Sequence, residues 1–207
     1  MKFRLSSKAA LVIIAAMFIL PLALAWLMHS GVIDFKPGSA RNLGELVQPP
    51  VPANWQDSLV FVPAVDKAPR DDPSVFFDRH WVILHVIPSP CPSSCLQAIS
   101  ALRQIHKASG RNQSRIRIAL LLQSGNQAET ISNVGEIYHL FRLVENPSGN
   151  IRSILEDVAH NFSTGAEGSS YLIDPIGNIM MFYEAGSDPN NLKTDLKRLL
   201  TWSKLDK

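Results

Sequence analysis

The two cysteines are the side chains of this chain best suited to chemistry. Cys91 and Cys95 are the only cysteines among 207 residues, and they lie four positions apart. A thiolate is a nucleophile, exchanges disulfides and binds soft ions such as Cu(I). It is stabilised near a helix N-terminus, where backbone N–H groups are unpaired and the dipole favours anions. The pair therefore predicts thiol–disulfide exchange or Cu(I) binding through Cys91 and Cys95.

Two other interpretations of the pair stay open. The first is a small structural disulfide, which an oxidising compartment permits. So short a loop constrains the unfolded chain little, so its stabilising effect should be modest. The second is a pair of buried thiols without a role, which an oxidising compartment disfavours.

The segments around the cysteines predict a strand, a helix and a second strand. Residues 81–87, W-V-I-L-H-V-I, form an apolar run typical of a central strand covered on both faces. Prolines then stop the pairing, and apolar spacing over 94–109 predicts a helix that Gly110 ends. Residues 116–122 predict the next central strand. Such a unit is parallel and right-handed, and it presents both cysteines where the helix begins.

The remaining elements extend the same order. Residues 59–65 predict an edge strand, and the pattern over 136–144 fits either a strand or a helix. Further along, we expect a helix over 147–162, strands over 171–174 and 179–183, and a final helix after Asp188-Pro189. The order β-α-β-α-β-β-α, with cysteines after the first long central strand, favours an α/β, thioredoxin-like domain: a central mixed sheet flanked by helices.

The N-terminal quarter of the chain predicts a membrane anchor and a tether. Residues 1–8 are basic, 9–28 form an uncharged transmembrane helix, 29–53 a Pro/Gly-rich linker, and 54–207 the thioredoxin-like domain. Basic residues before the span place the N-terminus in the cytoplasm and the domain outside. The alternative is a cleaved signal peptide, since Ala23-Leu24-Ala25 resembles a cleavage site. The mature protein would then be a secreted thiol reductase.

The histidines are candidates for a third metal ligand. His160 is the one that the loop after its helix could bring to the cysteines, giving a possible Cu(I) site of Cys91, Cys95 and His160. His85 lies in the first central strand, where a hydrogen-bonded core histidine is more common than a ligand. We expect His106 and His139 on the surface of their elements.

Composition excludes several classes of protein. The formal net charge is +2 and no basic stripe interleaves with aromatics, so nucleic acid is not an expected partner. The sequence holds no serine–histidine–aspartate spacing, phosphate loop or paired-carboxylate constellation.

The chain resembles the Sco/SenC group of membrane-anchored thioredoxin-fold proteins, which help to assemble the copper centre of cytochrome c oxidase. The anchor, the linker, the strand into C-P-S-S-C and the hairpin Y-L-I-D-P-I-G-N-I-M-M carry this resemblance. A closer likeness is to the thioredoxin-like transmembrane protein of bacterial cytochrome oxidase gene clusters, through G-E-L-V-Q-P-P, H-K-A-S-G-R-N and D-P-N-N-L-K-T-D-L-K-R-L-L.

The resemblance implies a single-pass protein of the bacterial inner membrane with its domain in the periplasm. It implies that Cys91 and Cys95 bind copper or exchange disulfides, with the copper-bearing oxidase subunit or its assembly factors as partners. The sequence departs from the group at two places: Ala166 occupies the position of the Sco histidine, and Ser169 and Ser170 stand where thioredoxins have a proline. These departures favour a second hypothesis, a non-catalytic tethered scaffold that binds assembly intermediates.

Overall fold

A computed structural model describes residues 7–29, 42–55, 58–62, 73–122, 128–137 and 139–203. The chain divides into two compact units, Met1–Arg41 and Asn42–Lys207. Each unit is described by itself. Residues 63–65 of the predicted edge strand lie outside the described residues.

The described residues of the first unit form an apolar helix, α1 (Ser7–His29). Its segment Lys8–Leu27 is long and apolar enough to cross a membrane, and a signal sequence would have the same character. Large apolar side chains such as Leu11, Phe18 and Trp26 are exposed along it. A helix that is apolar all round suits a lipid environment.

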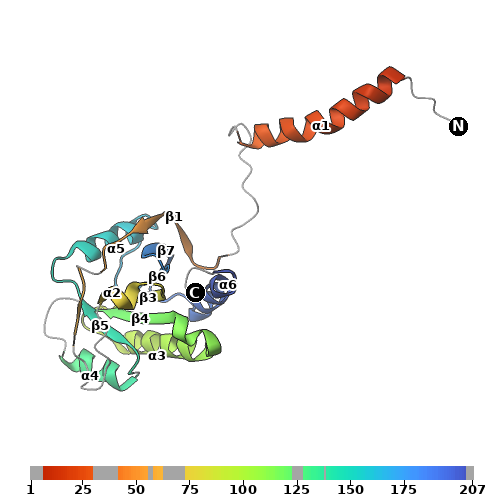
Figure 1. The fold of residues 1–207 in the computed structure, drawn as a ribbon. Coiled ribbons are helices and arrows are strands. Elements are labelled where there is room, and N and C mark those ends of the chain that lie inside the picture. The colour runs from red at the N-terminus through yellow and green to blue at the C-terminus, as the bar shows by residue number, and fades with distance from the viewer. Residues whose placement is uncertain are drawn as a thin grey trace. The chain divides into compact units, whose positions relative to one another are not determined.

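The second unit is a mixed sheet of seven strands, in the order β1-β7-β6-β3-β4-β5-β2 (Figure 1). The strands are β1 (Glu45–Pro52), β2 (Val60–Phe61), β3 (Trp81–Val86), β4 (Ile116–Leu121), β5 (Arg142–Glu145), β6 (Ser170–Ile173) and β7 (Asn178–Tyr183). Strands β3, β4 and β5 are parallel, and the other pairings are antiparallel. The predicted thioredoxin-like fold, with β3 and β4 as central strands, is confirmed.

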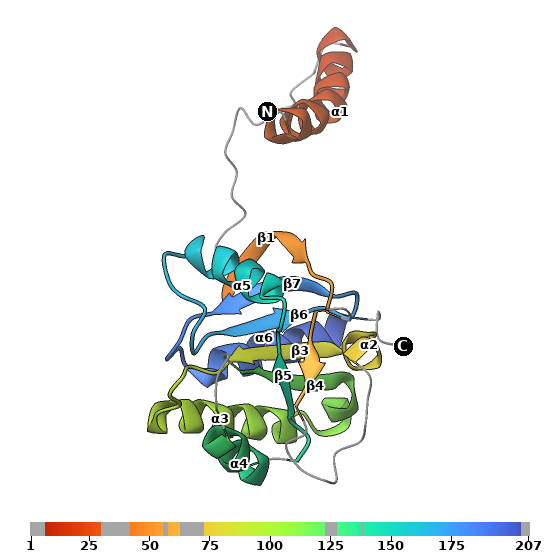
Figure 2. The same ribbon diagram turned by 90° about the vertical axis from the view of Figure 1, so that its left-hand side faces the viewer.

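The helices cover both faces of this sheet. The α-helices are α2 (Pro73–Phe77), α3 (Ser93–Ala108), α4 (Ala128–Ile137), α5 (Asn150–His160) and α6 (Pro189–Trp202), and a 3-10 helix, η1 (Gly110–Arg115), follows α3. Buried residues of α3, α4 and α6 share one core cluster, and those of α2 and α5 share the other. Figure 2 shows α3 and α4 on the side of the sheet away from α5. Alternate residues of β3 enter the two clusters, so this strand is buried on both faces.

Strand β1 corrects the expected linker. Residues 45–52 pair with β7 although they contain Pro49 and Pro50, which lie at an irregularity in the register. Prolines are tolerated there because β1 is an edge strand. The backbone N–H groups of Leu43 and Gly44 donate to Oδ2 of buried Asp195, at 2.8 and 2.9 Å. The folded unit therefore begins before the expected boundary at residue 54.

The stretch 136–144, whose sequence pattern fits either a strand or a helix, contains parts of both. Helix α4 ends in it at Ile137, the short strand β5 begins in it at Arg142, and β5 pairs with β4 on one side and β2 on the other. A four-residue strand is too short for its periodicity to be read from sequence. The edge position of β2 agrees with the prediction for its residues 60 and 61.

Candidate functional site

The two cysteines form a disulfide. The sulfurs of Cys91 and Cys95 are 2.06 Å apart and their Cα atoms 5.4 Å apart. Cys91 is half-buried, whereas Cys95 is only 5% exposed and packs in the core cluster beneath α3. Attack on a disulfide needs access to a sulfur. Cys91 is therefore the sulfur that an incoming thiolate reaches, and Cys95 is the sheltered partner.

The junction between β3 and α3 presents this disulfide at one end of the sheet. Pro92 is the N-cap residue of α3 and makes no side-chain capping hydrogen bond. Its carbonyl accepts from the N–H groups of Cys95 and Leu96, at 2.9 and 3.2 Å. Cys91 directly precedes this cap residue, so it lies next to the start of α3, where the helix dipole is positive and no side-chain oxygen caps the helix. Helix N-termini in general stabilise a thiolate.

The loop before β6 lies against the end of β3. Gly168 N–H donates to the Val86 carbonyl, and Val86 N–H donates to the Ser169 carbonyl, at 2.9 and 3.0 Å. Ser169 is fully buried, and its hydroxyl donates to the Gly165 carbonyl. Backbone hydrogen bonds thus fix Ser169 and Ser170 beside the strand that leads to the cysteines.

His160 is not brought together with the cysteines. It is exposed at the end of α5, and no cluster of three His, Cys, Asp or Glu side chains able to hold a metal occurs in the described part of the chain. Ala166, at the position of the Sco histidine, is 2% exposed, and its N–H donates to Glu156. The predicted set of Cys91, Cys95 and His160 is therefore not formed in this conformation.

His85 lies on β3 and is buried, as expected for a core histidine. Its Nδ1 is 3.0 Å from Ser170 Oγ, and the side chain is 2% exposed. Burial lowers the pKa of His85 from 6.5 to about 4, against a smaller opposing effect of the Ser169 backbone. His85 is therefore neutral at physiological pH.

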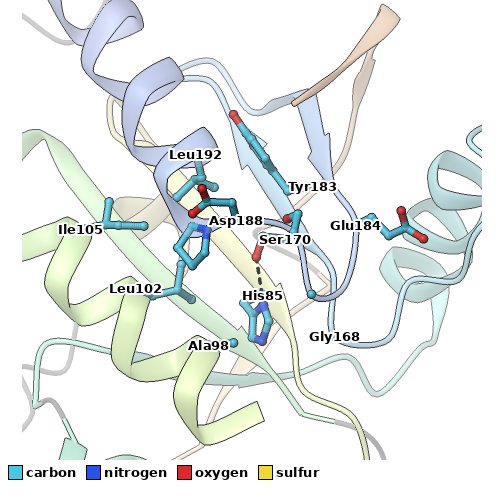
Figure 3. Close-up of a pocket in the computed structure, with 13 residues that line it drawn as sticks. His85, Ala98, Leu102, Ile105, Gly168, Ser170, Tyr183, Glu184, Asp188 and Leu192 are labelled. Atoms are coloured by element: carbon cyan, nitrogen blue, oxygen red, sulfur yellow. Dashed lines mark hydrogen bonds between the residues drawn. The ribbon is translucent and has the colours of Figure 1, made fainter. Parts of the chain in front are cut away.

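A cavity of about 70 Å³ opens beside His85. Figure 3 shows Leu102 and Ile105 of α3 on one side, Tyr183 on the other, and Ser170 bonded to His85. The register pairs His85 with Ser170 and Ser170 with Tyr183, so the cavity lies at the sheet end that carries the cysteines. Periodicity could not indicate it, because its walls come from β3, α3, β6, β7 and α6 and from the loops between them.

His106 corrects another expectation, since it is 5% exposed rather than on the surface. Its Nε2 is 3.2 Å from the Ile116 carbonyl, and its Nδ1 is 3.2 Å from Gln113 Nε2. Burial is the largest cause that lowers its pKa. His139, by contrast, is exposed as predicted.

Comparisons with known proteins agree with this fold. The apo Sco1 protein from Thermus thermophilus has a TM-score of 0.53 at 14% identity, covering 78% of this chain and 99% of its own. A putative electron transfer protein from Aquifex aeolicus has a TM-score of 0.52 at 13% identity, covering 72% of this chain and 96% of its own. None of the curated proteins matches the sequence. Residues 81–203 match the transmembrane-like, thioredoxin-like C-terminal domain family, so the chain belongs to that family.

Proposed function

We propose that this protein exchanges disulfides with a partner through Cys91 and Cys95. The observation that carries the proposal is the unequal exposure of the two bonded sulfurs, Cys91 half-buried and Cys95 nearly inaccessible. In the oxidising direction, a partner thiolate attacks Cys91 Sγ and Cys95 leaves as a thiolate. A second thiolate of the same partner then attacks the partner sulfur of the mixed disulfide, and Cys91 leaves as a thiolate. The partner gains a disulfide, and two electrons reduce the Cys91–Cys95 bond.

A purely structural role accounts less well for the pair. Closing a loop of five residues stabilises the folded state by only about 2 kcal/mol in the chain-entropy treatment. A buried apolar pair at the same positions could supply a similar stabilisation. A role in disulfide exchange therefore explains a short-loop disulfide at the uncapped start of a helix better than a role in stabilising the fold does.

The proposed setting is the outer face of a bacterial inner membrane, with α1 as a retained anchor and the N-terminus in the cytoplasm. The basic residues before α1 support this orientation. The proposed partner is the copper-bearing subunit of cytochrome c oxidase or one of its assembly factors. Support for this partner comes from the Sco/SenC-like motifs of the sequence, because a fold likeness at 14% identity does not identify a partner.

Cu(I) handling is the second use of the same sulfurs. A disulfide sulfur is not a thiolate, so two-electron reduction must precede metal binding. The reduced pair then offers two soft ligands on one short loop, without His160. Copper would be cargo here, and two-coordinate binding is the form that these residues support.

A trapping experiment tests disulfide exchange. Exchange is reversible, so in full-length Cys95→Ser, expressed in its own membrane, the free Cys91 thiolate attacks the disulfide of the partner. A mixed disulfide between Cys91 and the partner should then accumulate, because no Cys95 thiol is present to resolve it. Cys91→Ser is the matched control and should trap nothing. Equal trapping by both variants, or none by either, would contradict exchange through Cys91.

Two further measurements separate the alternatives. If a chain with both cysteines changed to serine supports full oxidase assembly in cells, the tethered scaffold is the correct function. Titration of the reduced full-length protein with Cu(I) tests copper handling. Binding no tighter than that of the double serine chain excludes it.

A further inference from the structure

His85 carries a buried nitrogen that the fold does not satisfy. Its Nε2 has no hydrogen-bond partner among the described residues, although the side chain is 2% exposed. An unsatisfied buried acceptor or donor costs free energy, so its place in the molecule needs a reason. The other ring nitrogen, Nδ1, is held at 3.0 Å from Ser170 Oγ.

The neutral ring of His85 carries one proton, on Nδ1 or on Nε2. The Ser170 hydroxyl can accept from Nδ1–H or donate to a bare Nδ1, so this hydrogen bond fits either tautomer. In the tautomer with the proton on Nδ1, Ser170 Oγ accepts it, and Nε2 is a bare acceptor with no partner among the described residues.

The side of β3 on which His85 lies is the side that packs under α3. Ile83 and Ile87, which flank His85 at alternate positions, share a core cluster with Cys95 and Leu102. In Figure 3 the His85 ring stands beside Ala98 of α3, with Nε2 on the side of the ring away from Ser170.

Cys95 lies on that same side of α3. It is three residues before Ala98, hence one helical turn nearer the N-terminus of α3. Its sulfur faces the core, because Cys95 is buried in the cluster with Ile83 and Ile87. In the disulfide this sulfur has no hydrogen to donate, whereas reduction gives it an S–H group. Reduction thus creates a new buried donor on the side of α3 that packs over His85.

We propose that His85 carries its proton on Nδ1, that its Nε2 accepts a hydrogen bond from the Cys95 thiol in the reduced protein, and that this bond makes the Cys91–Cys95 disulfide easier to reduce. Two molecules of glutathione supply two electrons and two protons, one to each sulfur, and leave as glutathione disulfide. The proton on Cys95 is the one shared with Nε2. The acceptor is unsatisfied only in the oxidised form, so His85 favours the reduced form. The inference deepens the proposed function, because it sets the direction in which the pair exchanges electrons.

The equilibrium constant for reduction by glutathione tests this inference. Full-length protein in detergent is equilibrated with glutathione buffers, and the reduced fraction is read by thiol alkylation. His85→Leu should lower the constant about tenfold, which corresponds to about 30 mV for a two-electron couple. His85→Gln, which keeps an acceptor oxygen near the position of Nε2, should stay within about threefold of the unchanged protein.

His106→Leu is the matched control. His106 is also a buried histidine of the α3 region, but both of its nitrogens have hydrogen-bond partners and it lies at the far end of the helix. This change should leave the constant within about twofold. An unchanged constant in folded His85→Leu, or an equal shift in His106→Leu, overturns the proposal.

A measurement on the unaltered sequence does not depend on any variant folding. With ¹⁵N-labelled histidine, the Nε2 resonance of His85 should move between the oxidised and reduced protein, because only the reduced form donates to it. Identical shifts in both forms overturn the inference. The glutathione assay needs no partner. If His85→Leu shifts the equilibrium constant but Cys95→Ser traps no partner, the proposed function is wrong and this inference stands. If Cys95→Ser traps a partner but His85→Leu leaves the constant unshifted, this inference is wrong and the proposed function stands.

Discussion

The β3–α3 junction and the β6–β7 turn lie at opposite ends of the sheet and are built in opposite ways. At the turn, a buried carboxylate on Asp174 accepts from Ile176 N–H, Asn178 N–H and Asn178 Nδ2, at 3.0, 2.8 and 3.0 Å. Gly177 supplies the positive φ of 93° that the turn requires. At the junction, Pro92 provides no side-chain cap, and a disulfide joins Cys91 to Cys95.

The difference shows how this fold separates stability from reactivity. Hydrogen bonds to a carboxylate fix the turn because nothing there needs to change during function. The junction has to break and remake a covalent bond, so polar groups around it stay available: the uncapped start of α3 and Nε2 of His85. Four predictions follow this contrast, from the largest expected effect on stability to the smallest.

Asp174→Ala should lower the free energy of unfolding by about 4 kcal/mol, because three charge-assisted hydrogen bonds are lost from a buried turn. Chemical denaturation of the full-length protein in detergent measures this loss. Asp174→Asn, which keeps an acceptor oxygen, should lose about half as much. The glutathione equilibrium of Cys91–Cys95 should stay unchanged. A shift in that equilibrium would mean that the two ends of the sheet are coupled.

Acid should destabilise the protein partly through His85. Its pKa falls from 6.5 in the unfolded chain to about 4 in the folded one, so the unfolded state binds the extra proton between these values. Stability is therefore full above pH 6.5 and declines as the pH falls towards 4, by up to about 3 kcal/mol. Denaturation curves at several pH values should show a weaker decline for His85→Leu. Parallel curves for the two proteins would contradict the assigned titration.

Changing both Cys91 and Cys95 to serine should cost only about 2 kcal/mol of stability, the value expected for so short a loop. Disulfide exchange, in contrast, should be abolished. Thermal or chemical denaturation measures the first effect, and loss of partner trapping the second. A stability loss as large as that of Asp174→Ala would instead indicate that the disulfide is chiefly structural.

Pro92→Asp would place a capping carboxylate at the junction. The gain from an N-cap offsets the loss of a rigid proline, so stability should change by less than about 1 kcal/mol. The added negative charge competes with the Cys91 thiolate for the start of α3, so alkylation of reduced Cys91 at neutral pH should slow severalfold. Pro92→Ala, which adds no charge, should alkylate at nearly the original rate. Equal rates for both variants would contradict the role of the open helix start.

Much of the fold could be predicted because its helices and strands follow local sequence patterns. The apolar run of β3, the helical spacing of α3 and the run of β4 each satisfy one periodicity over a whole element. Asp188 and Pro189 marked the start of α6, where the Asp188 side chain does accept from Asn190 N–H. The position of the cysteines between strand and helix followed from these elements alone.

The features that the sequence did not predict depend on contacts between residues far apart in the chain. β1 reads as a proline-rich linker until its pairing with β7 and the Asp195 hydrogen bonds are seen. His106 is buried, and its Nε2 lies 3.2 Å from the Ile116 carbonyl, a contact between residues ten positions apart that local periodicity does not indicate. The order of residues along the chain made His160 a candidate metal ligand, but α5 does not bring it to the cysteines.

The sequence by itself determined the anchor-like helix, the β-α-β core and the presentation of two sulfurs at its junction, because periodicity and turn chemistry act between near neighbours. Only the tertiary structure decided which sulfur is sheltered, where the cavity lies, and that His85 keeps an unsatisfied nitrogen under α3. Those properties depend on burial, which is set by the packing of several elements against one another and by no single segment.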